Sequence, residues 1–352
     1  MSDSITKRRK RVIITGANGF VGSNLTKYLS LDPSLEVYAM VRPKAPVNFL
    51  KDFQYNDDSG EKLFEIVECN LLDEDLIVKA FENKDIVIHL AGYVSDWGSK
   101  ERFWKLNVEG TKLVLQAAYK SKVSRVLYLS SLTVHGLGGH KYDNEDAPYA
   151  KKNNAYGESK KVGEELLLKW IANNPESDGA IIRPGFIIYG RFDKNSFILA
   201  LDAMAKGRFG FINRGKRLVS YVFVENLCYG INQLIQAEEL SGAYNILDGN
   251  MTWKEWVAKW EKAIGRKVTK ISVPYAFLVP ITAVMVGFYK LFRIKKSPLL
   301  NFYRINVMRK DLAFTNTKIK TEIGYHPPTE LDESMQQTLE FYYESKTKKE
   351  KK

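Results

Sequence analysis

The sequence predicts an α/β fold, with a doubly wound parallel sheet in its first half and a smaller mixed C-terminal domain after it. Short apolar runs rich in β-branched residues alternate with helical patterns as far as residue 190, which is typical of βαβ units. These runs are apolar along their whole length, as expected for strands that helices cover on both faces. A glycine-rich turn after the first run gives the same indication.

Six apolar runs are predicted to be strands, and the segments between them helices. The strands are expected at 12–16, 36–42, 64–70, 85–92, 125–131 and 179–187. The helices are expected as far as Leu29 and at 73–82, 104–121 and 156–173. Beyond residue 190 the strand pattern becomes sparse and the aromatic content rises. We therefore divide the chain into a first domain at 11–190 and a second at 191–343, with basic tails at 1–10 and 344–352.

Composition limits the classes of function. The 352 residues are 45% hydrophobic and 27% charged, as in an ordinary globular protein. Cys69 and Cys228 are too few for a disulfide framework, and the four histidines lack metal-ligand spacing, so we expect a reducing compartment and no bound metal. The net charge of +12 comes largely from the two ends. These ends are expected to be solvated tails, with attraction to an anionic membrane or to nucleic acid as the alternative.

The stretch ITGANGFVG connects the first strand to the first helix, with Gly16, Gly19 and Gly22 spaced three apart. A sharp turn, a backbone that touches a pyrophosphate and a close helix–strand contact each require a residue without a Cβ atom. The helix that follows the turn then presents N–H groups to the phosphates. The pattern therefore predicts a Rossmann-type dinucleotide-binding domain at 11–190.

This spacing resembles the TGxxGxxG loop of the extended short-chain dehydrogenase/reductases, the NAD-dependent epimerase/dehydratase family. Further motifs of that family follow in order: HLAG, LNVEGT, SSLTVHG, the YxxxK of Tyr156 and Lys160, and RPGFIIYG. The resemblance covers about residues 11–330. It implies that the second domain, 191–343, binds the substrate.

The resemblance also implies a catalytic group made of Ser131, Tyr156, Lys160 and Asn107. Tyr156 and Lys160 are four residues apart on a helix and so share a face, where the ammonium would lower the pKa of the phenol. In the family the tyrosine exchanges a proton with the substrate oxygen, and the lysine also binds the nicotinamide ribose. Asn107 resembles the residue that holds the lysine through a water.

Two adjacent serines compete for the third catalytic role. Ser130 and Ser131 end the fifth strand, where alternation places them on opposite faces. The VHG that follows aligns Ser131 with the family's hydroxyl residue, and Thr133 is the weaker substitute. We therefore assign Ser131.

The cofactor residues implied by the resemblance are Gly16, Gly19, Phe20, Val21, Gly22, Arg42, Asn70, Leu71, Ala91, Tyr156, Lys160 and Pro184. Arg42 ends the second strand, where a basic residue accommodates a 2′-phosphate and an acidic one binds a ribose 2′-OH. NADP(H) is therefore the preferred cofactor, with NAD(H) as the alternative. Asn70 stands where the family usually has aspartate, which puts the adenine contact in doubt.

The family includes oxidoreductases, epimerases and dehydratases. A sugar dehydratase needs an acidic pair where this chain has Leu132 and Thr133, which disfavours that class. SDWG at 95–98 and ENL at 225–227 resemble the 3β-hydroxysteroid dehydrogenase and dihydroflavonol-reductase-like group. We expect hydride transfer at a secondary alcohol or ketone of a lipid-like substrate. The alternatives are a nucleotide-sugar epimerase, in which Arg217 would meet a diphosphate, and a non-catalytic dinucleotide sensor.

One segment has no counterpart in the βαβ pattern. Residues 271–289 carry no charge, and KLFRIKK follows them. The length approaches that of a bilayer span, although Pro274, Pro280 and Gly287 interrupt a straight helix. A buried or substrate-lining helix, an in-plane membrane contact and a span all stay open. The segment 271–292 resembles the membrane-associating region of the hydroxysteroid dehydrogenases.

Partners and location follow from the same features. We expect a small apolar substrate and no nucleic acid. Family members often dimerise through paired helices, here 104–121 and 156–173. The N-terminus lacks the apolar run of a signal peptide, so the expected location is cytoplasmic, with the inner face of a membrane as a peripheral site.

Overall fold

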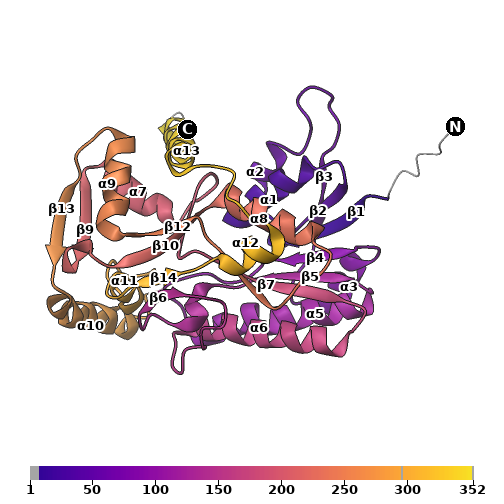
Figure 1. Cartoon of the computed structure of the whole chain (residues 1–352), viewed down its shortest axis with the longest axis horizontal. Helices are drawn as coiled ribbons and strands as arrows, with labels where there is room; N and C mark the ends of the chain where they lie inside the picture. Colours follow the sequence, from indigo (N-terminus) through magenta and orange to yellow (C-terminus); the bar gives the residue numbers. More distant parts are fainter. Residues whose placement is uncertain (1–7, 295, 351–352) are drawn as a thin grey trace.

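The computed structural model describes residues 8–294 and 296–350, and the largest unit within these ranges is a seven-stranded parallel sheet (Figure 1). Its strands, in spatial order, are β11 (Ala243–Ile246), β7 (Asp178–Pro184), β5 (Arg125–Leu129), β4 (Ile86–His89), β1 (Lys10–Thr15), β2 (Leu35–Val41) and β3 (Phe64–Glu68). The order reverses between β1 and β4, which is where doubly wound sheets bind their ligands. The predicted fold class is confirmed.

Helices cover both faces of this sheet. One face carries α1 (Phe20–Ser30), α8 (Val224–Gln236) and α12 (Thr317–Ile323), and the other carries α3 (Glu74–Phe81), α5 (Gly110–Lys120) and α6 (Ala155–Asn173). Within β1, Val12 and Ile14 pack into the first of these cores, and Ile13 packs into the second. A strand buried on both faces must be apolar at every position, which explains the continuous runs in the sequence.

The run predicted as one strand at 179–187 is two strands. β7 ends at Pro184, and β8 (Ile187–Tyr189) pairs with β10 (Leu218–Phe223) in a second sheet. Gly185 makes the crossing possible, because a Cβ atom there would lie 2.9 Å from the Tyr221 carbonyl carbon. The chain then returns to the first sheet with α8 and β11. Residues on both sides of position 190 thus contribute to the first sheet. The predicted domain boundary at residue 190 therefore stays a prediction.

The second lobe contains the rest of the sheet structure. β10 also pairs with β12 (Gly249–Thr252) and β14 (Leu312–Phe314), and β14 pairs with β6 (His140–Asp143). β9 (Arg208–Ile212) and β13 (Thr269–Val273) form a separate parallel pair. The helices of this lobe are α7 (Phe197–Ala205), α9 (Trp253–Ile264), α10 (Tyr275–Leu291), α11 (Phe302–Val307) and α13 (Leu331–Glu350). Short helical turns lie at α2 (Asn48–Lys51), α4 (Lys100–Phe103), η1 (Trp104–Glu109), η2 (Leu132–His135) and η3 (Asn213–Gly215).

The predicted tails are shorter than expected where the structure describes them. Lys10 already belongs to β1, and Arg9 donates to the Leu35 carbonyl at 2.9 Å. Residues 1–7 and 351–352 lie outside the described residues. The segment predicted as a C-terminal tail from 344 continues α13 as far as Glu350.

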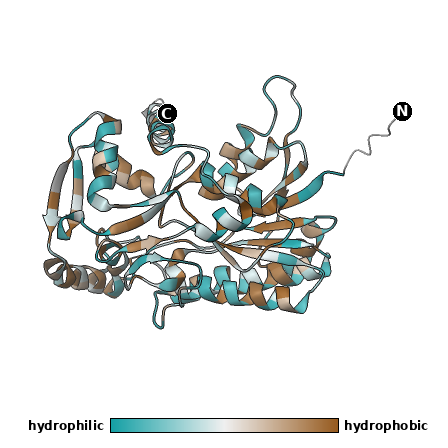
Figure 2. Ribbon diagram, in the orientation of Figure 1, coloured by the Kyte–Doolittle hydropathy of each residue, from teal (hydrophilic) through white to brown (hydrophobic). Residues whose placement is uncertain are grey.

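The apolar segment forms α10, which lies at the edge of the second lobe (Figure 1) and stands out in brown at the lower left of Figure 2. None of the helices in the described ranges has the length and apolarity that crossing a bilayer requires. Leu278, Thr282 and Val286 are buried, so α10 packs on the lobe along one face only.

Candidate active site

The glycine turn after β1 has the geometry of a dinucleotide cradle. Gly16 has φ +71°, and a Cβ atom there would lie 2.8 Å from the Ala91 Cα atom. A Cβ atom at Gly22 would lie 2.3 Å from the Gly16 carbonyl oxygen. Gly19 is exposed and forms the N-cap of α1, so the first N–H groups of the helix face outward. These features fit a pyrophosphate at the helix N-terminus.

Tyr156 and Ser131 come together where β5 ends and α6 begins. The Asn154 side chain accepts from the Gly157 N–H at 2.9 Å and starts α6, so Tyr156 lies in its first turn. Ser131 precedes η2 and lies near the Tyr156 phenol. Burial raises the pKa of Tyr156 above its ordinary value, and the nearby Ser131 hydroxyl opposes this rise. The phenol is therefore protonated at neutral pH and is suited to donate a proton.

Lys160 lies one turn further along α6 and is buried. Its ammonium donates to the Leu129 carbonyl at 2.7 Å and lies 4.8 Å from the centre of the Tyr128 ring. Burial lowers the pKa of Lys160 to about 8, against the opposing charge of Glu164. Lys160 is not among the groups that shift the pKa of Tyr156, which burial raises, so the expected lowering by this ammonium stays a prediction.

Asn107 lies in η1, a π-helical stretch that replaces the first turns of the helix predicted at 104–121. Its amide donates to the Tyr93 carbonyl at 3.0 Å and to the Ser159 hydroxyl at 2.9 Å, and its oxygen accepts from the Tyr93 N–H at 2.6 Å. A π-helical turn re-aims one side chain and is frequent at functional sites. Asn107 thus ties the segment after β4 to α6 beside Lys160.

The two serines at the end of β5 have different partners. Ser130 donates to Glu164, whereas the Ser131 hydroxyl lies 2.8 Å from that of Thr133. Glu164 is fully buried and also accepts from Arg183 at 2.6 Å. Ser130 therefore belongs to a buried ion-pair network, and Ser131 faces the site.

The remaining predicted cofactor residues lie around the same edge of the sheet. Arg42 follows β2 and is exposed, and the Ala91 N–H donates to the Thr15 hydroxyl at 3.2 Å. The Asn70 oxygen accepts from the Leu72 N–H at 3.2 Å, so the amide closes its own turn. The other predicted positions of this set are Phe20 and Val21 at the start of α1, Leu71 against Gly110, and buried Pro184 at the end of β7.

Sequence reasoning did not find the part of the site that α11 contributes. Tyr303 lies near both residues: Thr133 lowers the pKa of Tyr303, and Tyr303 raises the pKa of Tyr156. Arg304 forms an ion pair with Asp96, which lies in the segment after β4. Asp96 stands inside the SDWG motif, but YRIN at 303–306 matches no motif, and only the packing of the lobe brings it here.

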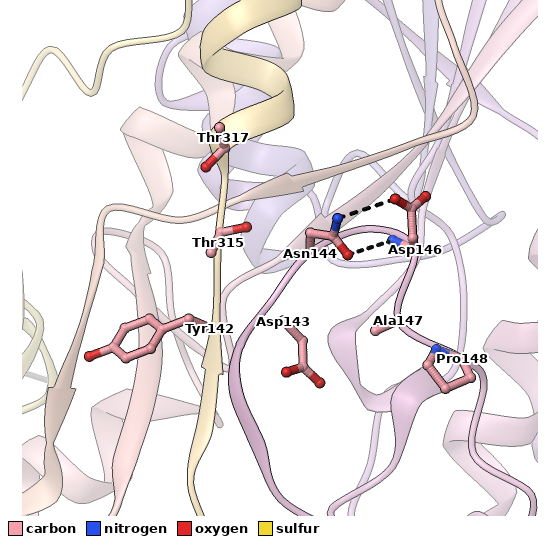
Figure 3. Close-up of a pocket in the computed structure, with 8 residues that line it drawn as sticks. All are labelled: Tyr142, Asp143, Asn144, Asp146, Ala147, Pro148, Thr315 and Thr317. Carbon is pink, nitrogen blue, oxygen red and sulfur yellow. Dashed lines mark hydrogen bonds between the residues drawn. The ribbon is translucent and has the colours of Figure 1, made fainter.

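Figure 3 shows a surface cavity of about 570 Å³ elsewhere in the molecule. It is lined by residues 142–144 and 146–148 together with Thr315 and Thr317, and Asn144 and Asp146 are hydrogen-bonded at its rim. These residues are not among those predicted for the site. The cavity is therefore not assigned to the chemistry of Tyr156.

Comparisons with known proteins agree with this geometry. The sequence model of the NAD dependent epimerase/dehydratase family matches residues 12–246. The chain is 25% identical over 371 aligned residues to 3beta-hydroxysteroid-dehydrogenase/decarboxylase isoform 1 of Arabidopsis thaliana, covering 99% of this chain and 83% of the relative. It is 26% identical to the N-acetyl-alpha-D-glucosaminyl-diphospho-ditrans,octacis-undecaprenol 4-epimerase of Escherichia coli O157:H7, covering 94% and 95% of the two chains. The solved UDP-glucuronic acid 4-epimerase of Bacillus cereus in complex with NAD superposes with a TM-score of 0.75 at 18% identity, over 95% of this chain and 96% of the other.

Proposed function

The chain belongs to the NAD dependent epimerase/dehydratase family, and within that family we propose that it transfers a hydride between a nicotinamide cofactor and a secondary alcohol or ketone of a lipid-like substrate. The substrate class is a 3β-hydroxysteroid or a long-chain β-keto or β-hydroxy acid. One observation carries this choice among the family's reactions: an exposed apolar helix, α10, is joined to the site by a series of aromatic side chains.

In the proposed reaction, Tyr156 transfers a proton to or from the substrate oxygen. In ketone reduction the Tyr156 hydroxyl donates its proton to the substrate oxygen, and in alcohol oxidation the phenolate takes it back. Ser131 donates a hydrogen bond to the same oxygen and holds it beside Tyr156. Tyr156 is protonated near pH 7 and so holds the proton that ketone reduction requires, while its raised pKa makes it a weaker acid than a free phenol.

The residues that would hold the cofactor fit a dinucleotide. The glycine turn and the start of α1 would receive the pyrophosphate, and Lys160 would bind the ribose. A bound nicotinamide supplies the hydride in reduction and accepts it in oxidation. Arg42 is exposed beyond β2, where a 2′-phosphate would lie, so NADP(H) is the proposed preference, with NAD(H) as the alternative.

The exposed face of α10 supports an apolar substrate. Phe277, Ile281, Val284, Phe288 and Leu291 follow one another at helical spacing and form what we call the α10 stripe. Val284 is 74% exposed and Leu291 is 76% exposed. A contiguous apolar face of this kind marks a binding surface for a partner or a lipid. Lys290, Arg293 and Lys296 lie at its C-terminal end and are exposed, which suits anionic headgroups.

Aromatic side chains extend from α10 to the site. Tyr289 of α10 lies edge-on to Trp97 with ring centroids 6.3 Å apart, and Tyr93 donates to the Trp97 carbonyl at 3.0 Å. Tyr93 lies 4.8 Å from Phe103, and Phe103 lies 6.1 Å from Tyr156. We propose that the α10 stripe rests on a membrane in the plane of the interface and that an apolar substrate reaches Tyr156 along these rings.

A second function is favoured by one relative. The Escherichia coli epimerase acts, by its name, on a sugar diphosphate carried by undecaprenol. The α10 stripe would equally accommodate a polyprenyl chain. An epimerase of a lipid-linked sugar is therefore the alternative, alongside the nucleotide-sugar epimerase in which Arg217 binds the diphosphate. Arg217 is half exposed and lies 3.4 Å from Asp311.

The two functions differ in their net redox change. Purified protein with NADPH or NADP⁺ is mixed with 3-keto- and 3β-hydroxysteroids, long-chain β-keto acids, UDP-sugars and polyprenyl-diphosphate sugars. The proposed function predicts a continuous change in nicotinamide absorbance with the first two classes. An epimerase shows product by chromatography with no net absorbance change. That second result, obtained with a sugar substrate, rejects the oxidoreductase.

The proposed homodimer pairs α5 and α6 with their counterparts in a second copy. Tyr119 at the end of α5 is 65% exposed, and Leu168 of α6 is also exposed. Sedimentation analysis of the protein and of Leu168→Glu tests the pairing. A monomer in both samples rejects it.

A further inference from the structure

A buried carboxylate in the middle of α6 joins three segments of the chain beside the site. Glu164 is fully buried, and its two oxygens accept four hydrogen bonds. Arg183 of β7 donates from two nitrogens, at 3.0 and 2.6 Å, and the Tyr149 hydroxyl donates at 2.8 Å. Ser130, the residue after β5, donates the fourth bond. A carboxylate has about four acceptor positions, so Glu164 is saturated and the Ser130 hydrogen is committed to it.

Ser130 stands between two residues that serve the site. The carbonyl of Leu129, before it, accepts from the Lys160 ammonium at 2.7 Å. Ser131, after it, faces the site. The backbone N–H of Ser130 donates to a carbonyl of β7 at 2.8 Å, while its hydroxyl bonds to α6. The segment 129–131 is therefore held to β7 by its backbone and to α6 by the Ser130 side chain.

α6 contacts this segment at two adjacent points. Lys160 and Glu164 are four residues apart on the helix and so lie on the same face. Lys160 binds the carbonyl of Leu129, and Glu164 binds the hydroxyl of the next residue. A shift of the segment that breaks the second bond also displaces the acceptor of the first. The place of Lys160 in the site thus depends on the serine that points away from it.

The Leu129 carbonyl determines how the Lys160 ammonium is oriented. An ammonium has three N–H donors, and within the described residues that of Lys160 makes one hydrogen bond, to this carbonyl. The direction of that bond fixes where the other two N–H groups point. The nitrogen lies beside the exposed Gly92, where an added Cβ atom would be 3.6 Å from it. The two remaining donors are therefore available on the open side, where the cofactor would lie.

We propose that Ser130 is a positioning residue for cofactor binding: its bond to Glu164 holds the adjacent carbonyl in place, and that carbonyl directs the free N–H groups of Lys160 toward the nicotinamide ribose. This inference rests on the proposed cofactor role of Lys160. It goes beyond that role because it assigns a task to the serine that faces away from the site. The ion pair of Glu164 with Arg183 then serves cofactor binding as well as the fold.

Tyr149 separates this role from a purely structural one. It donates to the same carboxylate as Ser130, but it comes from the segment before α6 and not from 129–131. Loss of either hydroxyl weakens the hydrogen bonding of Glu164 by one donor, and the two bonds from Arg183 still hold α6 to β7. Only the loss of the Ser130 hydroxyl releases the segment that carries the acceptor of the ammonium.

The test measures NADPH affinity by fluorescence titration and needs no substrate. At pH 7, below the Lys160 pKa of about 8, the ammonium carries its charge. Ser130→Ala is expected to weaken binding about fivefold, the value of one hydrogen bond. Tyr149→Phe is the matched control and should bind NADPH as the parent does. In the Lys160→Met background Ser130→Ala should have no further effect, because the serine acts only through the missing ammonium.

Three results overturn the inference: unchanged affinity in Ser130→Ala, an equal loss in Tyr149→Phe, or a loss from Ser130→Ala that persists at full size in the Lys160→Met protein. The last result is what a general loosening of the fold produces. Failure of the proposed function has a separate signature. In that case the affinities change as expected, but the parent protein turns over no steroid and no β-keto acid.

Discussion

The turn after β1 and the first turn of α11 both lie at the site, but they reach it in different ways. Gly22 acts through local geometry, because a Cβ atom there would collide with the Gly16 carbonyl oxygen of the same turn. Tyr303 reaches the site through contacts between segments far apart in the chain, such as the ion pair of Arg304 with Asp96. The cofactor side of the site can therefore be predicted from residue spacing in the sequence. The substrate side cannot, because it depends on how the second lobe packs.

The two regions also differ in how far their ion pairs are exposed to solvent. Glu164 and Arg183 are almost fully buried, with side chains 0% and 4% exposed. Asp96 and Arg304 are partly solvated, with side chains 18% and 40% exposed. A buried pair is costly to break, and an exposed pair contributes little. We infer a rigid cofactor side and a substrate lobe that is more weakly attached to it.

Breaking one pair in each region tests this contrast directly and has the largest expected effect. Glu164→Gln leaves the Arg183 charge buried without a partner, and the free energy of unfolding should fall by about 3–5 kcal/mol. Asp96→Asn is the matched change in the exposed pair and should cost less than about 1 kcal/mol. Urea denaturation followed by circular dichroism measures both. Equal losses would show that the two regions are equally tightly held.

A smaller effect is expected from filling the glycine turn. Gly22→Ala places a Cβ atom 2.3 Å from the Gly16 oxygen, so the turn must open. Dinucleotide affinity should fall about 10- to 100-fold, as for other overpacked sites. Titration of NADPH fluorescence measures this. Gly138→Ala is the control, because a Cβ atom there meets no described atom within 4 Å. Unchanged affinity in Gly22→Ala would remove the turn from the cofactor site.

The smallest effect concerns the surface of the second lobe. Val284→Glu puts a charge in the middle of the α10 stripe, and binding to anionic phospholipid vesicles should weaken about tenfold. Vesicle co-sedimentation measures the bound fraction. Leu31→Glu is the control, because Leu31 is 64% exposed at the far end of α1. Unchanged binding in Val284→Glu would mean that α10 does not touch the membrane.

The elements that were predicted from sequence are those with a strong local signal. The six apolar runs lie on strands because the central sheet is covered on both faces. β11 was missed, because AYNI at 243–246 is short and partly polar, and its place beside β7 depends on a return of the chain. The break after Pro184 was missed because the apolar pattern continues across it, while the backbone changes sheets.

For the candidate site, strand alternation separated Ser130 from Ser131, which do have different partners. The environment of Tyr156 was not predictable. Its pKa depends on burial in the folded protein, and spacing within α6 carries no information on that burial. Tyr303 was missed for the same reason, since no motif marks α11.

The central claim is that Tyr156 gives the proton in a hydride transfer. The most direct measurement compares wild-type protein with Tyr156→Phe in NADPH oxidation by the steroid or β-keto acid that the panel identifies, with the NADPH dissociation constant measured in parallel. The account predicts that kcat falls by at least about 100-fold, the usual contribution of a general acid, while the dissociation constant changes by less than about twofold. Retained turnover with Phe at position 156 would contradict the account.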